Sequence, residues 1–98
     1  MIFVKIHKTK FRDVIAVCDS NLIGKKFEEK DLQLTITERF YKGEVMAEEK
    51  IITLLENAEN VNIVGKESIK IGIKAGIIIK ENIITIEGIP HAQYATIE

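Results

Sequence analysis

The sequence contains a single cysteine, a single proline and no long apolar run. Cys18 has no partner for an internal disulfide and no CxxC neighbour, which fits a reducing compartment and argues against a structural zinc site. Residues 75–79 form an apolar run of only five, far below the roughly 20 residues that cross a bilayer. The opening MIFVKIHK lacks the features of a secretory signal. We therefore expect a cytoplasmic protein with no membrane segment, and we predict no metal site and no cofactor.

Size and composition predict one globular domain covering residues 1–98. An apolar fraction of 46% with 30% charged residues is typical of a folded, water-soluble chain. The formal net charge of −1 gives no overall attraction for a polyanion. A local basic patch is still allowed, because four cations follow closely on one another near the start. These cations are Lys5, Lys8, Lys10 and Arg12.

The apolar periodicity predicts an α+β fold. Apolar residues alternate with polar ones, or gather in short β-branched runs, in several segments typical of strands. From Ala47 to Ala58 the spacing becomes helical, with Glu48 and Glu49 in the first turn, where the helix dipole favours anions. The expected strands are residues 2–7, 14–18, 32–36, 61–64 and 83–86, with a final extended segment at 94–97. We expect a mixed or antiparallel sheet of about five strands with two helices on one face.

The stretch SIKIGIKAGIII fits two kinds of element. Alternation of Ile69, Ile71 and Ile73 is typical of a strand, whereas the spacing from Ile69 to Ile73 to Ile77 is helical. Gly76 suits the left-handed residue that follows a helix. Gly72 would cost about 1 kcal/mol inside a helix relative to alanine. We favour a short helix over residues 66–75 and keep the strand as the alternative.

The segment GIPHAQ holds the only proline and one of the two histidines. Gly88 permits a positive φ, and Pro90 fixes its own φ and extends the residue before it, so the segment predicts a preset bend. His91 and Gln93 can both donate and accept hydrogen bonds, which suits a phosphate, a carboxylate or a base edge. The alternative is a turn between strands with two solvated polar side chains.

Cys18 and Asp19 end the second predicted strand. A nucleophilic cysteine needs a cationic neighbour or a helix N-terminus to lower its pKa, and the sequence shows neither nearby. We therefore expect Cys18 to pack structurally, with a cleft position as the alternative. A metal held by His7, Cys18, Asp19 and His91 is not favoured, because no local ligand spacing supports it.

The segment NIVGKES places Gly65 between a predicted strand and a predicted helix. Backbone N–H groups at such a helix start can receive an anion, with Asn62 close by. The segment lacks the GxxxxGK[ST] loop and the GxGxxG spacing, so a simple turn is the stronger interpretation of Gly65. We keep Asn62 and Gly65 as candidate binding residues.

Phe40 and Tyr41 are adjacent aromatic residues beside a turn glycine. Stacking on a nucleobase is one interpretation, but RNA-reading sheets usually offer aromatics at alternating strand positions among many more cations. The favoured interpretation makes Phe40 a core residue and Tyr41 a half-exposed cap.

Several short segments, in this order, resemble a family of small archaeal proteins known as domain-of-unknown-function family 424. They are VCD at 17–19, LIGKKF at 22–27, FYKGE at 40–44, NIVGKE at 62–67 and GIPHAQ at 88–93. The resemblance runs nearly end to end, and GIPHAQ is its most specific element. It implies a one-domain α+β cytoplasmic protein without an agreed activity, and it supports a helix at 66–75. It also suggests a role in translation or RNA handling, which is an association and not a site-based argument.

Three functional hypotheses follow. The first is a non-enzymatic binding module in archaeal translation or RNA machinery, with RNA or a ribonucleoprotein as partner, using a groove around GIPHAQ with help from Asn62 and Gly65. The second is a small enzyme in which His91 transfers a proton near Cys18 or Asp19; no residue is assigned as catalytic on sequence grounds. The third is a homo-oligomer joined through an isoleucine-rich edge or face.

Overall fold

The computed structural model describes residues 1–96 and contains a six-stranded mixed sheet. Its strands are β1 (Ile2–His7), β2 (Val14–Asp19), β5 (Glu44–Val45), β6 (Asn60–Val64), β7 (Ile84–Ile86) and β8 (Ile89–Ala95), in the spatial order β5-β1-β2-β6-β8-β7. The pairing of β2 with β6 is parallel, and the other four pairings are antiparallel. The predicted α+β fold with a mixed sheet is confirmed, with six strands where about five were expected. The expected strand at 32–36 is not part of this sheet and lies in a separate two-stranded one.

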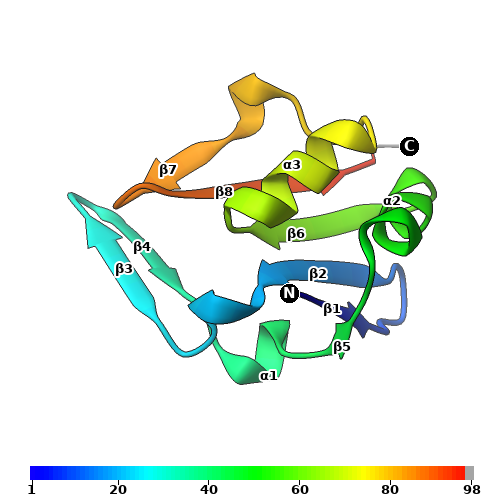
Figure 1. Ribbon diagram of the computed structural model, residues 1–98, viewed down its shortest axis with the longest axis horizontal. Helices are drawn as coiled ribbons and strands as arrows, with labels where there is room; N and C mark the ends of the chain where they lie inside the picture. The colour runs from blue at the N-terminus through cyan, green and yellow to red at the C-terminus, as the bar shows by residue number, and fades with distance from the viewer. Residues whose placement is uncertain (97–98) are drawn as a thin grey trace.

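Two helices, α2 (Glu48–Glu56) and α3 (Lys66–Lys74), cover one face of this sheet, as predicted (Figure 1). Apolar side chains of both helices pack on inward-facing side chains of the central strands, because strand residues alternate between the two faces. The buried residues of this first core are Val4, Ile15, Val17, Ile51, Leu55, Val61, Ile63, Ile69, Ile71, Ile78 and Ala92. This layer supplies most of the apolar burial that stabilises the domain.

The ambiguous isoleucine stretch is a helix. Ile69 and Ile71 are buried, whereas Ile73 is 48% exposed, which a strand with all three on one face would not give. Gly72 lets α3 lie close to its neighbours, because a Cβ at this position would lie 2.8 Å from Ile78 Cγ1. Close packing outweighs the low helix propensity of glycine here.

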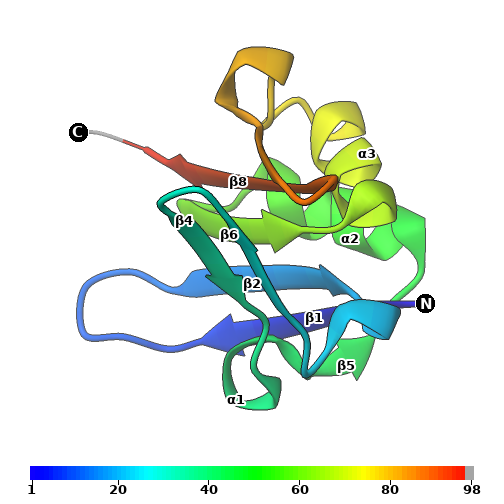
Figure 2. The same cartoon turned by 90° about the vertical axis from the view of Figure 1, so that its left-hand side faces the viewer.

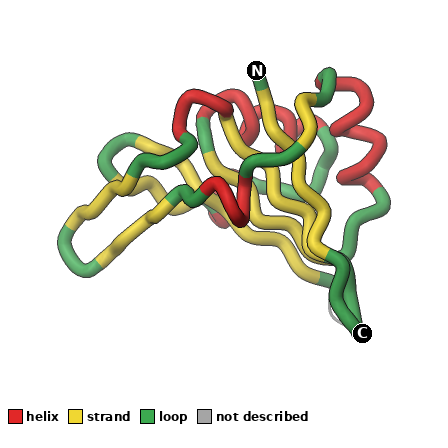
Figure 3. The backbone as a smooth tube through the Cα atoms, turned by 90° about the horizontal axis from the view of Figure 1, so that it is seen from below, coloured by secondary structure: helices red, strands yellow, loops and turns green. Residues whose placement is uncertain are grey.

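The opposite face is covered only in part. A separate hairpin of β3 (Lys26–Glu29) and β4 (Leu32–Thr35), together with the short α1 (Glu38–Tyr41), closes one end of it. Figure 2 shows β4 running across the central strands, and Figure 3 shows the hairpin projecting from the end of the sheet away from the C-terminus. The buried residues of this second core are Ala16, Cys18, Leu22, Leu34, Ile36, Tyr41, Val64 and Ile86.

Several elements differ from the sequence-based expectation. β3, β5 and α1 were not predicted, and two 3₁₀ turns lie at Ser20–Leu22 and Lys80–Asn82. The expected extended segment at 94–97 belongs to the longer β8, which ends at Ala95; residue 97 lies outside the described residues. No helix within residues 1–96 is long and apolar enough to cross a membrane.

Candidate functional site

The uncovered part of the sheet face carries a row of polar side chains. The strand register pairs Lys5 with Ala16, Ala16 with Asn62, and Asn62 with Gln93, so these residues lie side by side across four strands. The face is the one opposite α2 and α3, since Ala16 belongs to the second core. We call this surface the polar face; it consists of Lys5, His7, Tyr41, Asn62, His91 and Gln93.

A hydrogen-bond network at the centre of the polar face joins Tyr41, Asn62 and His91. Asn62 Oδ1 accepts from the Tyr41 hydroxyl at 2.6 Å and from His91 Nε2 at 3.0 Å. An amide oxygen only accepts, so His91 carries its proton on Nε2, and Nδ1 is an acceptor with no partner among residues 1–96. The Asn62 NH₂ group remains as a donor. The network therefore fixes the orientation of three side chains that come from α1, β6 and β8.

Burial sets the protonation states in this network. Desolvation lowers the pKa of His91 below its usual 6.5, because burial penalises the charged ring. Desolvation, followed by the nearby Cys18, raises the pKa of Tyr41 from 10.0 to about 12. At neutral pH both groups are uncharged, so the centre of the polar face offers neutral donors and acceptors.

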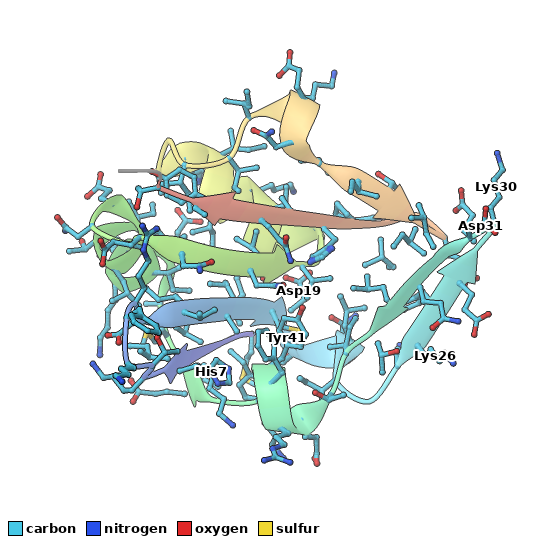
Figure 4. All side chains as sticks on the ribbon, turned by 180° about the vertical axis from the view of Figure 1, so that it is seen from behind. His7, Asp19, Lys26, Lys30, Asp31 and Tyr41 are labelled. Atoms are coloured by element: carbon cyan, nitrogen blue, oxygen red, sulfur yellow. The ribbon has the colours of Figure 1, made fainter. Side chains whose placement is uncertain are left out.

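One border of the polar face is formed by a stacked pair of rings. His7 and Phe40 stack with their centroids 4.5 Å apart and their planes 18° from parallel, and His7 Nε2 bonds the Phe40 carbonyl at 2.8 Å. The Lys5 ammonium donates a hydrogen bond to the Arg39 carbonyl, and this bond keeps the Lys5 charge beside the two rings. A pocket of about 340 Å³ lies here, lined by Lys5, His7, Thr37, Arg39 and Phe40. Figure 4 shows His7 and Tyr41 on this side of the sheet.

The structure reverses the predicted roles of Phe40 and Tyr41. Tyr41 is 4% exposed and belongs to the second core, whereas Phe40 is only partly buried and lines the pocket. The short helix α1 turns Tyr41 toward Asn62. Neither the network partner of Tyr41 nor the His7–Phe40 stack was predicted, because each pair is separated by at least 21 residues.

The GIPHAQ segment is a strand with a turn at its start. Gly88, with φ of 80°, follows Glu87 in the turn between β7 and β8, and Pro90 lies within β8. The interpretation of His91 and Gln93 as solvated turn residues is therefore wrong for His91, which is partly buried and hydrogen-bonded, whereas Gln93 is exposed. Residues 91 and 93 lie two apart in one strand, so both side chains belong to the same face.

Asp19 and Gly65 form a helix cap and not an open anion site. The Asp19 carboxylate accepts from the Ser68 N–H at 2.8 Å, the Ser68 hydroxyl at 2.7 Å and the Glu67 N–H at 3.1 Å. These donors begin α3, so the chain's own carboxylate takes the place that the predicted anion would need. The hypothesis of anion binding at the Gly65 junction is therefore wrong. Asn62, the other residue of that candidate, lies on the polar face.

Cys18 is fully buried, as the structural interpretation predicts. Desolvation, followed by the charge of Asp19, raises its pKa from 9.0 to about 12, so the thiol stays protonated at neutral pH. Val64 lies between Cys18 and His91 in the register, which puts two strand spacings, about 9 to 10 Å, between their backbones. Asp19 binds α3 on the other face. No hydrogen bond joins His91 to either residue within residues 1–96, so proton transfer between them stays a prediction.

Comparison with known proteins agrees with the resemblance seen in the sequence. Residues 7–97 match the family described as protein of unknown function, DUF424. The chain belongs to this DUF424 family. Its fold is similar to the crystal structure of an uncharacterized conserved protein from Methanopyrus kandleri, with a TM-score of 0.82 and 25% identity over 99% of this chain and 95% of that one. Comparison with functionally curated proteins found no significant match.

Proposed function

We propose that this DUF424 protein is a non-enzymatic module that binds single-stranded RNA on the polar face. The observation that carries the proposal is the stacked His7–Phe40 pair, which lies beside two cations and borders a row of uncharged hydrogen-bonding groups. Single-stranded RNA is bound by the same combination: aromatic rings for bases, cations for phosphates, and amides or histidines for base edges. A role in archaeal translation or RNA handling rests on the family resemblance, and the polar face supports its RNA component.

The free cations of the pocket support a polyanionic ligand. Six lysines of residues 1–96 lie within 4 Å of a carboxylate, at distances from 2.9 to 3.7 Å. Within the same residues, Lys5 and Arg39 have no carboxylate within that distance, and both line the pocket beside the ring pair. Their charge is therefore available to a phosphate, although the net charge of the whole chain is −1.

The hydrogen-bonding groups of the polar face support contact with bases. Within residues 1–96, no buried side-chain nitrogen or oxygen lacks a hydrogen-bond partner. The Asn62 NH₂ and His91 Nδ1 have no protein partner within those residues, so both are open to solvent. A donor and an acceptor held on neighbouring strands match the edge of an unpaired base, which presents both kinds of group.

The alternatives receive less support. The polar face brings together no carboxylate, and its nearest thiol has a raised pKa, so it lacks the activated groups that acid–base or nucleophilic catalysis needs. The edge strands β5 and β7 are two and three residues long, which offers few backbone groups to a second copy. Self-association through the half-exposed Ile73, Ile79 and Ile84 stays a prediction.

Fluorescence anisotropy with a labelled RNA of about 12 nucleotides, a length one small module can cover, tests the proposal. We expect a dissociation constant on the order of 1 to 100 µM at physiological salt. Arg39→Gln removes a cation of the pocket and Gln93→Ala removes a hydrogen-bonding group of the polar face, so both should weaken binding. Both side chains are exposed, so the core stays intact. Lys70→Gln is the matched control, since α3 lies on the opposite face of the sheet.

The result that would overturn the proposal is an absence of saturable RNA binding, or equal losses in Lys70→Gln and Arg39→Gln. Equal losses would mean that only the overall charge matters. Unfolding curves of all three variants should match that of the unaltered protein, so that weaker binding reports on the surface and not on the fold.

A further inference from the structure

We propose that the loop between β1 and β2 is a second contact for the same RNA strand, in which Phe11 stacks on an unpaired base. This inference rests on the proposed function and adds a second base site to it. The observation that carries it is the exposure of Phe11, which is 88% accessible. Apart from Met1, the other exposed large apolar side chains within residues 1–96 lie between 40% and 57%. Folding therefore gains almost nothing from this ring, which leaves it available for a ligand.

The loop holds Phe11 in a defined place. Thr9 Oγ1 accepts from the Phe11 N–H at 3.3 Å and from the Arg12 N–H at 2.9 Å, and the Thr9 hydroxyl donates to the Arg12 carbonyl. Arg12 Nη1 in turn donates to the Thr96 carbonyl, which ties the loop to the chain after β8. Because the backbone at Phe11 is already held, only the side-chain torsions of the ring need to be ordered when a base stacks on it.

The charge around Phe11 suits a nucleic acid strand. Residues 8–13 contain three cations and one carboxylate, a local net charge of +2 in a chain of net charge −1. Lys8 is paired with Asp13 at 2.9 Å, which leaves Lys10 and Arg12 without a carboxylate within 4 Å in the described part of the chain. Lys10 Nζ lies 6.0 Å from the centroid of the Phe11 ring. A phosphate beside a stacked base would therefore meet a cation.

A pocket of about 400 Å³ lies beside the ring, between the loop and the C-terminal end of α2. Ile6, Phe11 and Leu54 provide apolar lining, and Asn57 provides an amide. Lys8 and Arg12 line it together with Asp13 and Glu59, so its charges balance. A neutral base fits a pocket of balanced charge better than a phosphate does, which places the base inside and the phosphate at Lys10.

The loop also continues the path of the polar face. His7 ends β1 on the polar face, and the loop begins at the next residue. The pocket beside Phe11 lies on the α2 side of the sheet, because Ile6, Ile15 and Leu54 line it. An RNA strand with a base stacked at His7 and Phe40 would therefore pass round the end of the sheet at Lys8 and Lys10 before it places a following base at Phe11. Two stacking sites joined by cations are typical of proteins that bind single-stranded nucleic acid without reading its sequence.

The absence of tryptophan from the sequence gives a direct test. Phe11→Trp introduces one indole, whose fluorescence should be quenched by the RNA of about 12 nucleotides with the same saturation as the anisotropy signal. Ile73→Trp, at an exposed site on α3, is the matched control and should not be quenched. Phe11→Leu keeps an apolar side chain but removes the ring, so RNA affinity should fall by at least about fivefold.

The possible failures point to different conclusions. RNA binding that is weakened by Gln93→Ala but unchanged by Phe11→Leu, with no quenching of the introduced indole, overturns the loop contact and leaves the proposed function standing. No RNA binding by the unaltered protein overturns both. A blue shift of the indole with vesicles of phosphatidylglycerol, without quenching by RNA, would assign the loop to an anionic membrane surface and overturn the inference.

Discussion

The carboxylate of Asp19 occupies the space that a side chain at position 65 would need. A Cβ built on Gly65 would lie 2.3 Å from Asp19 Cγ and 2.6 Å from Asp19 Oδ2. Gly65 also has a φ of 109°, in the region that favours glycine. The end of β2 and the start of α3 can therefore meet only if residue 65 has no side chain, and their contact brings the cap on Ser68 into place.

Gly65→Ala should destabilise the protein by about 3 kcal/mol or more, since the strain of a side chain at this φ and ψ and the overpacking against Asp19 add. Gly24→Ala is the matched control, because Gly24 has a φ of 84° but no atom within 4 Å of a built Cβ. That variant should lose only about 1 to 2 kcal/mol. Urea unfolding of both variants measures the two free energies.

A double-variant cycle separates the two causes. In an Asp19→Ala background the clash is gone, so Gly65→Ala should then cost less than in the unaltered protein, because only the backbone strain remains. If Gly65→Ala costs the same with and without the Asp19 carboxylate, the close contact between the two residues is not what excludes a side chain.

The sequence predicted those elements whose buried apolar residues recur at a regular strand or helix period, including β4 and β7 of the second core. β1, β2, β6, α2 and α3 each carry buried side chains of the first core at strand or helix periods, so periodicity located them. β3 has only Phe27 as an apolar residue and could not be found in this way. Its position depends on distant contacts: Glu28 N–H donates to Glu87 Oε2, and Glu87 N–H donates to Glu29 Oε1, both at 2.7 Å.

The candidate site was predictable only within one strand. The motif at 88–93 was expected to form a bend that brings His91 and Gln93 together; it is a strand, and strand alternation places both side chains on one face. The partner of His91 depends on the register of β6 against β8, and the Tyr41–Asn62 bond depends on where α1 turns the chain. Asp19 and Ser68 are 49 residues apart, so no local sequence pattern could indicate that the Asp19 carboxylate caps the helix where an anion was expected.

Cys18 should resist alkylation in the folded protein. Its thiol is fully buried and its pKa is raised from 9.0 to about 12, and only the thiolate reacts. The thiolate fraction at pH 8 is then about a thousandfold below that of an ordinary thiol, which predicts a comparable loss of rate. Iodoacetamide labelling followed by mass spectrometry measures this, and the same reaction in guanidinium is the control. Equal rates in both conditions would contradict burial of the thiol.

Alkaline pH should destabilise the protein through the same thiol. In the unfolded chain Cys18 loses its proton near pH 9, whereas the folded protein retains it to about 12. The unfolded state therefore binds fewer protons in this window, and stability falls as pH rises, by up to about 1.4 kcal/mol per pH unit. In Cys18→Ala the fall should begin only near pH 10, where Tyr41 contributes. Urea midpoints from pH 8 to 11 decide this; a fall that begins near pH 9 in Cys18→Ala would contradict the assignment.

His91 should give the opposite pH dependence on the acid side. Burial lowers its pKa in the folded protein, so below about pH 6.5 the unfolded chain binds a proton that the folded protein does not. The free energy of unfolding therefore falls as the pH drops from 6.5 toward the pKa that His91 has in the folded protein. NMR titration of the imidazole protons, assigned by comparison with His91→Gln, should show a midpoint below 6.5. A midpoint at or above that value would mean that Asn62 and Tyr41 do not shield the ring.

The salt dependence of RNA binding should separate phosphate contacts from base contacts on the polar face. For single strands, each phosphate contact adds about 0.7 to the slope of log affinity against log salt. Arg39→Gln removes one exposed cation of the pocket and should reduce the slope by about that amount. Gln93→Ala removes an uncharged group, so affinity should fall while the slope stays the same. Lys70→Gln, on the other face, should change neither. A reduced slope in Gln93→Ala, or an unchanged slope in Arg39→Gln, would show that these side chains do not meet the strand in the roles that their chemistry predicts.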